Sequence, residues 1–171
     1  VIVGEGSVDP LVYTPHAFQY ASSKGPLQDI HPAGQAKSTA ARINDHNVVV
    51  GSAWASSMGL PRAFAQTDAA LWLDQSSSIN ESDACGINND GDAVLRTHAT
   101  DSPESATIVK VATEGTLNTT VTAGQTVTVT SVSSGSNIVP ADINNNGEVL
   151  GVARGADDDK IFIYNKTTGQ S

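Results

Sequence analysis

The chain has 171 residues, which suits one compact domain and is too short for two of ordinary size. Its formal net charge is −9 and its nine Lys and Arg residues are spread thinly, which excludes the basic surface that nucleic acid or an anionic membrane requires. Apolar residues make up 39%, and much of the remainder is Ser, Thr, Asn, Asp and Gly. These are residues of turns and strand surfaces, so we predict a single all-β domain over 1–171.

The first predicted elements are two short strands and a hairpin. Residues 16–20 alternate in polarity around a central phenylalanine, and residues 26–30 form a shorter strand. Residues 43–51 then read Ile-Asn-Asp-His-Asn-Val-Val-Val-Gly: an apolar residue, a polar turn and a β-branched run. This pattern is typical of a β-hairpin, and Asn47 is a residue that tolerates the positive φ such turns need.

The same phrase occurs twice more. Residues 87–95 read Ile-Asn-Asn-Asp-Gly-Asp-Ala-Val-Leu, and residues 143–151 read Ile-Asn-Asn-Asn-Gly-Glu-Val-Leu-Gly. The copies begin about 44 and then about 56 residues apart, a period typical of stacked units such as propeller blades. The aromatic strand also recurs, at 62–66 and 160–164. The chain is therefore predicted to be a repeat protein of short antiparallel strands, propeller-like in build.

The third unit is longer than the others. Residues 106–132 alternate Thr and Val, and Gly124-Gln125 is a turn signal, so we expect an extra hairpin there with its Val face buried.

The two ends look like halves of one unit. Val1-Ile2-Val3-Gly4 resembles the end of the repeated phrase, and residues 160–171 resemble the start of a unit. We expect about four units, at approximately 16–53, 62–97, 105–155, and 159–171 together with 1–7. Three arrangements stay open: a ring closed on itself, head-to-tail joining of molecules, and a fragment whose neighbouring units lie elsewhere in a parent protein.

Three segments resemble the HAF family of extracellular repeats: His16-Ala17-Phe18, Leu27-Gln28-Asp29-Ile30, and the run from Ala41-Arg42-Ile43-Asn44-Asp45 to Val48-Val49-Val50-Gly51. The resemblance covers nearly the whole chain and is weakest in the Thr-rich part. The second unit departs from it, because Leu95 stands where the closing glycine is expected. The resemblance implies a secreted or surface-exposed bacterial protein of propeller-like all-β build, and it implies no catalytic residues.

The strongest metal candidate is Asp142-Ile143-Asn144-Asn145-Asn146-Gly147, which matches the opening of a calcium loop. The match fails at its twelfth position, which is Ala153, and the other copies carry Arg42 or Gly86 where Asp142 stands. A hairpin turn explains all three copies, so we assign no metal ligands and no cofactor. The acidic run Asp157-Asp158-Asp159 is interpreted as a solvated loop.

No catalytic frame stands out, and no catalytic residue is assigned. Three kinds of residue each have a structural and a functional interpretation. The histidines are either turn or surface residues or catalysts, and the aromatic residues either pack in the core or form a platform on which sugars stack. The lone cysteine is either a buried apolar residue or a reactive thiol. Three sequons permit N-glycosylation in a suitable host. These candidates are His16, His31, His46 and His98; Trp54, Trp72, Tyr13 and Tyr20; Cys85; and Asn80, Asn118 and Asn165.

Three functions are weighed. The first is a non-enzymatic extracellular module for structure, adhesion, matrix contact or self-assembly, with self-association through the complementary termini or open strand edges. The alternative is a glycan- or small-ligand-binding propeller, with calcium as a candidate stabiliser. The third is an enzyme acting on extracellular polymers through the dispersed carboxylates Asp29, Asp74 and Asp92. We favour the first, and expect neither nucleic-acid binding nor membrane insertion.

Overall fold

The computed structural model describes residues 1–7, 14–20, 25–66, 70–74, 79–111, 122–127, 135–155 and 158–171. Within them the protein is all-β, with short antiparallel strands in four small sheets and no helix. No helix capable of crossing a membrane therefore occurs in this part of the chain.

Each sheet is built from strands that are consecutive in the chain. The first contains β1 (Ile2–Ser7), β2 (Pro15–Tyr20) and β3 (Gln28–Asp29). The second contains β4 (Lys37–Ile43), β5 (Val49–Trp54), β6 (Pro61–Gln66) and β7 (Ala70–Trp72). The third contains β8 (Glu81–Ile87), β9 (Asp92–His98), β10 (Ser105–Lys110) and β11 (Thr122–Thr126). The fourth contains β12 (Asn137–Ile143), β13 (Glu148–Arg154) and β14 (Asp159–Asn165).

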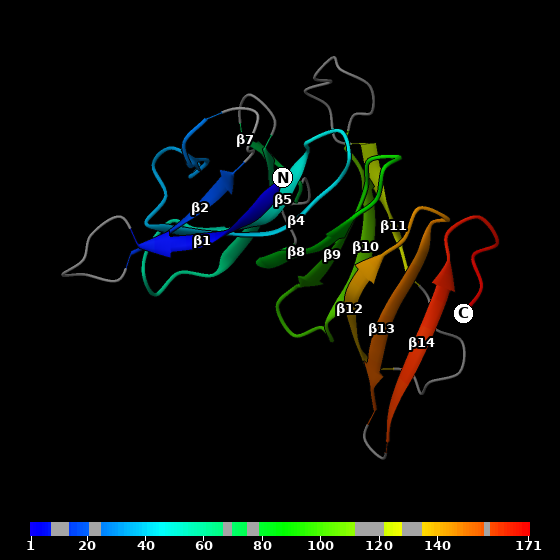
Figure 1. Ribbon diagram of the computed structural model, residues 1–171. Helices are drawn as coiled ribbons and strands as arrows, with labels where there is room; N and C mark the ends of the chain where they lie inside the picture. Colours follow the sequence, from blue (N-terminus) through cyan, green and yellow to red (C-terminus); the bar gives the residue numbers. More distant parts are fainter. Residues whose placement is uncertain are drawn as a thin grey trace.

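The sheets follow one another in chain order, from the blue end of the molecule to the red end (Figure 1). The first strand of each later sheet packs on the sheet before it: β4 on β1 and β2, β8 on β5 and β6, and β12 on β8 and β9. The first and fourth sheets lie at opposite ends of this stack (Figure 1), and their strands do not pair. The described residues thus form an open stack, without a closed ring.

The sheets do not have the boundaries of the predicted units. Three of the four predicted units start at an aromatic strand, whereas the hydrogen bonds make that strand the second of the first sheet and the third of the second and fourth sheets. The predicted unit 105–155 starts at β10, which is the third strand of the third sheet. The two ends of the chain do not form one shared unit, because β1 pairs with β2 and β14 pairs with β13. The boundaries differ because the Ile-Asn hairpin joins the first two strands of a sheet. The sheet therefore begins with the strand before the hairpin and not with the aromatic strand.

The predicted extra hairpin is confirmed in part: β10 and β11 are consecutive strands that pair antiparallel, but they belong to the third sheet and their turn is not at Gly124-Gln125. Residues 105–110 and 122–126 form β10 and β11, which are the third and fourth strands of the third sheet. Gly124 and Gln125 lie within β11, where Gln125 pairs with Ile108, and they form no turn. Val127 is buried as expected, while residues 128–134 lie outside the described part.

The three repeated hairpins are confirmed. Each turn closes through the same pair of backbone bonds; in the first copy the Asn44 amide donates to the Val48 carbonyl and the Asn47 amide to the Asn44 carbonyl. Asn47, Gly91 and Gly147 have φ of 63°, 78° and 74°. Asparagine therefore replaces glycine at a left-handed position, as the sequence predicts.

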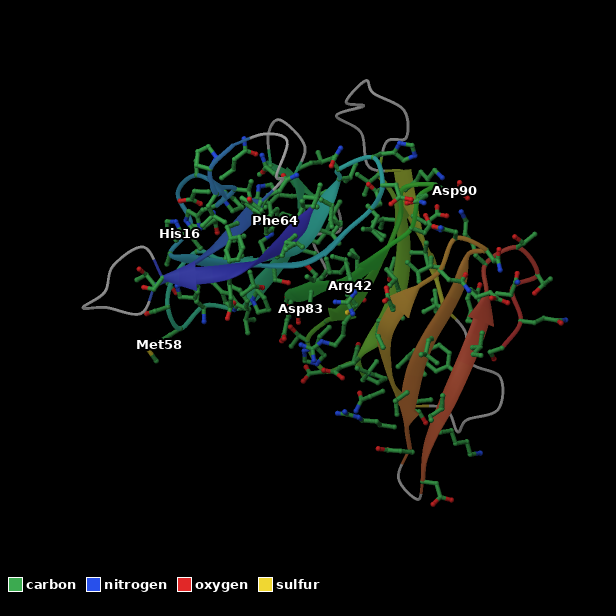
Figure 2. The ribbon with its side chains drawn as sticks, in the orientation of Figure 1. His16, Arg42, Met58, Phe64, Asp83 and Asp90 are labelled. Carbon is green, nitrogen blue, oxygen red and sulfur yellow. The ribbon has the colours of Figure 1, made fainter. Side chains whose placement is uncertain are left out.

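A glycine opposite a phenylalanine recurs in three of the sheets. Gly4 faces Phe18, Gly51 faces Phe64, and Gly151 faces Phe162 across neighbouring strands. The ring lies over the glycine, since a Cβ on Gly51 would stand 3.1 Å from Cε1 of Phe64. Figure 2 shows Phe64 among the side chains between the first two sheets.

The third sheet exchanges the large and small members of this pair. Leu95 stands at the glycine position, and directly opposite it Thr107 replaces phenylalanine. Leu95 is fully buried in the cluster between the second and third sheets. The missing glycine is thus balanced by a smaller residue on the facing strand, which keeps the core filled.

Candidate functional site

The three Ile-Asn turns lie side by side and form the most regular polar feature of the molecule, here called the turn ladder. Its members are Asn44, Asn88 and Asn144 with the residues that follow each of them. Each asparagine first organises its own turn through Oδ1: Asn44 accepts from the Val48 amide at 3.0 Å and Asn88 from the Asp92 amide at 2.8 Å. Asn144 does the same with the Glu148 amide at 2.9 Å.

The amide nitrogens then connect successive turns. Nδ2 of Asn44 donates to the Asn88 carbonyl at 3.0 Å, and Nδ2 of Asn88 donates to the Asn144 carbonyl at 3.1 Å. One residue later, the Asp45 amide donates to Oδ1 of Asn89, and the Asn89 amide donates to Oδ1 of Asn145. An amide side chain has the acceptor and the donor that a ladder position uses, on two separate atoms of one planar group.

The ladder has a direction. The side chains of Asn44 and Asn88 donate toward the turn of the next sheet, whereas Nδ2 of Asn144 donates to Oε2 of Glu148 in its own turn, at 2.7 Å. Asn44 and Asn88 are buried, and Asn144 is exposed. The fourth sheet therefore carries the asparagine without the neighbour that its counterparts bind.

The candidate calcium turn belongs to this ladder. Asp142 accepts from the Ile143 amide through Oδ1, and its Oδ2 lies 3.3 Å from Nε of Arg42. Arg42, Gly86 and Asp142 occupy one repeat position in three successive sheets, and a Cβ on Gly86 would stand 2.5 Å from Oδ1 of Asp142. Among the described residues, no three His, Cys, Asp or Glu side chains are grouped to bind a metal ion.

The Arg42–Asp142 pair is expected to contribute little to stability. Both side chains are about half exposed, so water and salt screen their attraction. We expect Arg42→Ala to lower the free energy of unfolding by less than about 1 kcal/mol. Urea denaturation at low and high salt measures this, and the difference from the unsubstituted protein should shrink at high salt. A loss larger than about 2 kcal/mol at both salt concentrations would contradict a screened pair.

The three carboxylates proposed for the enzyme hypothesis lie in three different sheets. Asp29 is in β3 and bonds His16 at 2.8 Å, while Asp74 follows β7 and makes a two-pronged pair with Arg62 at 2.7 and 2.9 Å. Asp92 begins β9. The structure therefore does not bring them together, and each is held by basic side chains of its own: His16 for Asp29, Arg62 for Asp74, and Lys110 and Lys166 for Asp92.

Asp92 is the most buried of them, at 2% exposure, and it connects two sheets. Nζ of Lys166, which follows β14, lies 2.7 Å from its Oδ1, and Nζ of Lys110 lies at 3.4 Å. Burial alone would raise the pKa of Asp92, but the hydrogen bonds from Lys166 and Asn88 and the two lysine charges outweigh it and lower the pKa.

A lowered carboxyl pKa predicts a loss of stability in acid. The stabilising contribution of Asp92 is present above the unfolded-state pKa, near 3.8, and is lost as the pH falls through the lower folded-state value. We expect Asp92→Asn to be less stable than the unsubstituted protein at neutral pH, with the difference narrowing as the pH falls below that ordinary value. Thermal unfolding across the acidic range measures this. A difference that does not change with pH would show that the charge of Asp92 is not what stabilises the fold.

Two of the candidate histidines lie together. The rings of His16 and His31 stack with centroids 3.7 Å apart. Nε2 of His31 lies 2.8 Å from the Gln35 carbonyl, which can only accept, and Nδ1 lies 2.7 Å from the Ser38 hydroxyl. In a neutral imidazole ring, Nε2 then donates and Nδ1 accepts from Ser38. This resembles a serine activated by histidine, but Ser38 is fully buried and its Oγ also accepts from the Ala17 amide at 2.9 Å.

The next sheet repeats that arrangement with other residues. Oγ of Ser82 accepts from the Ala63 amide at 2.9 Å and donates to Asp74 at 3.1 Å. Because histidine in one copy and aspartate in the next hold equivalent serines, we interpret Ser38 and Ser82 as bridges between sheets. His46 is exposed in its turn, and His98 lies near Glu81.

The aromatic residues and the cysteine have local partners. Nζ of Lys37 lies 4.5 Å from the centre of the Trp54 ring, and the Arg62 guanidinium lies 4.7 Å from that of Trp72. Cys85 packs partly buried against the cluster between the third and fourth sheets, and burial raises the pKa of its thiol.

Of the remaining candidates, Asn80 bonds Thr100, and Asn165 accepts from the Thr167 and Thr168 amides. Tyr20 is exposed at the end of β2. Tyr13, Asn118 and Asp157 lie outside the described residues.

The fourth sheet also carries an apolar face that sequence reasoning missed. Leu150, Ile161 and Ile163 are 46%, 80% and 59% exposed and point away from the third sheet; this set is here called the outer face of the fourth sheet. Leu150 and Ile163 line a groove of about 310 Å³ beside the last turn of the ladder. The remaining groove residues are Asp142, Ile143, Asn144 and Glu148. The alternation in β14 was visible, but no local signal says which face lacks a neighbour.

Comparison of the chain with models of known protein families, with curated proteins and with solved structures found no match.

Proposed function

We propose that this protein is a non-enzymatic extracellular module that serves as a structural scaffold and self-assembles. One observation carries the proposal: the same residue positions join the second sheet to the third and the third to the fourth. The turn ladder uses Asn44 and Asn88 in the same way at both junctions. Residues that recur at the same repeat position and hold neighbouring sheets together favour a structural role. In such a role the protein presents a surface and extends it by stacking further units.

The finer architecture belongs to the proposal. We interpret the four antiparallel sheets as successive blades of a propeller-like stack, which accounts for the repeat period and for sheets of three or four strands. The resemblance to HAF repeats supports a secreted or surface-exposed location and adhesion or matrix contact as the setting. The contact of Asp29 with His16 and the ion pairs of Asp74 and Asp92 support a structural use of these carboxylates.

Solution mass tests the scaffold proposal. We expect light scattering over a wide range of protein concentration to show a mass that grows with concentration. Growth that survives high salt would indicate apolar contacts, because ionic contacts between acidic molecules are screened. A monomer mass at every concentration would overturn self-assembly.

The groove gives the ligand-binding alternative one specific observation. Its acidic and amide side chains border the apolar Leu150 and Ile163, a mixture that suits a small polar ligand such as a sugar. A glycan array and a thermal shift with calcium test it. Binding in the array, lost in a Glu148→Ala variant, would place the site in this groove; no hits and no shift would remove the alternative.

A further inference from the structure

Repeat position by repeat position, the outer face of the fourth sheet matches the faces that are buried inside the stack. Leu150 corresponds to Val50 and Val94, because all three stand seven residues after the Ile of the repeated phrase. Val50 and Val94 are completely buried by the following sheet. Leu150 occupies the same repeat position in the fourth sheet, but no described sheet packs on it.

The strand beside it shows the same relation. Ile163 pairs with Leu150 as Ala65 pairs with Val50 and Ile108 with Val94. Both counterparts of Ile163 are buried, at 1% and 3% exposure, in the clusters that join one sheet to the next. The fourth sheet has even larger side chains there than the second, so its outer face is not a polar cap such as ends a repeat stack.

The first sheet has the complementary face. Ile2 pairs with Tyr20 as Val149 pairs with Tyr164. Val149 and Tyr164 are buried against the third sheet, whereas Ile2 and Tyr20 are 64% and 40% exposed. Together with Phe18 they are here called the outer face of the first sheet, which turns away from the second because Pro15, Ala17 and Gln19 are the buried alternation.

From these correspondences we propose that the outer face of the fourth sheet binds the outer face of the first sheet of a second copy of this chain. The joint continues the junctions already present within the stack: Ile2 and Tyr20 of the second copy take the places against Leu150 and Ile163 that Val149 and Tyr164 take against Val94 and Ile108. The two faces differ, so the contact is head-to-tail and propagates into a chain or a ring.

The joint is weaker than the internal junctions. Inside the stack, β4, β8 and β12 make most of the contact with the preceding sheet, and among the described strands the first sheet, β1-β2-β3, has no counterpart of them. The contact between copies therefore relies on the side chains of β1 and β2 alone. Association in the micromolar range or weaker is expected, about the strength of small transient interfaces.

This inference rests on the proposed self-assembly and names its surface. The test uses the full chain with single charges placed on each face: Ile163→Glu, Ile161→Glu as a second variant on the same face, and Ile2→Glu. Met58→Glu is the matched control, because Met58 is 95% exposed and points away from the body of the molecule (Figure 2). Circular dichroism establishes that each variant is folded.

Light scattering is expected to show that the three face variants associate at least about tenfold more weakly, while Met58→Glu associates like the unsubstituted protein. Mixing Ile163→Glu with Ile2→Glu is the decisive step. Each variant keeps one intact face, so the mixture should form dimers and stop there.

The failures are distinct. If the unsubstituted protein grows but the face variants grow equally well, the surface is wrong and the scaffold proposal stands. If Ile163→Glu blocks growth while Ile2→Glu does not, a symmetric contact replaces the head-to-tail one. A monomer at all concentrations overturns both proposals.

Discussion

Replacing Gly51 with alanine is expected to destabilise the protein by about 3 kcal/mol or more. The added methyl group would overlap the Thr39 carbonyl oxygen and would stand 3.1 Å from both Cα of Ala40 and the Phe64 ring. The ring could turn, but the carbonyl belongs to β4, which is paired with β5 and packed on the first sheet. Urea denaturation measures the loss.

Gly4→Ala is the matched control. Gly4 holds the same repeat position and also faces a phenylalanine, but β1 is the edge strand of its sheet among the described strands. The three described atoms nearest to a Cβ there all belong to the Phe18 ring, with Cζ at 3.1 Å. We expect a change within about 1 kcal/mol. Equal losses in the two variants would show that the aromatic ring, and not the β4 backbone, sets the need for glycine.

Asn88→Ala should lower the free energy of unfolding by about 2 to 4 kcal/mol. The residue is buried, and the variant loses the bond to the Asn144 carbonyl, the bond from the Asp92 amide and a contact with the Asp92 carboxylate. The Asp92 amide would then be buried without its partner, while the Asn144 carbonyl keeps its bond from the Gly147 amide. Asn88→Asp should also be destabilising, because it keeps the acceptor and replaces the donor with a second anion beside Asp92.

The comparison variant is Asn144→Ala, at the exposed end of the ladder. Asn144 organises its own turn but donates to no following sheet, so we expect a loss of about 1 kcal/mol or less. Thermal and urea unfolding of both variants give the difference. Similar losses at the two positions would mean that the turn alone matters and that the bonds between sheets add nothing.

The local elements were largely predictable. The Ile-Asn phrase predicted three hairpins because the turn residues and the β-branched run act over only a few residues. Asn47 was placed correctly in a left-handed position by the same reasoning. The aromatic strands and the short strand after the first of them were also found, as β2, β6, β14 and β3.

Grouping those strands into sheets was not predictable. The repeat has the same period wherever its boundary is drawn, so the pattern did not say whether Phe18 or Ile43 belongs near the start of a sheet. The answer depends on which strand hydrogen-bonds to which. For β10 and β11, the Thr-Val alternation correctly indicated two antiparallel strands, but Gly124 lies within β11, and the pairing of β10 with β9 makes both strands part of the third sheet.

The turn ladder was within reach of the sequence but was not recognised. The repeat spacing places an asparagine at 44, 88 and 144. The pattern indicated that these side chains organise their own turns, but it gave no sign that two of them also bond the turn of the next sheet. The Arg42–Asp142 pair was harder to predict from the sequence, because its two residues are 100 positions apart and Gly86 stands at the repeat position between them.

By itself, the sequence determined the all-β class, the repeat and its turns, because polarity alternation and turn chemistry depend on neighbouring residues. Only the tertiary structure decided which face of each strand is covered. Val50, Val94 and Leu150 occupy equivalent positions in the sequence repeat. A following sheet buries Val50 and Val94, whereas no described sheet packs on Leu150, which is exposed. Burial depends on what packs against a side chain, and that is set by residues far along the chain.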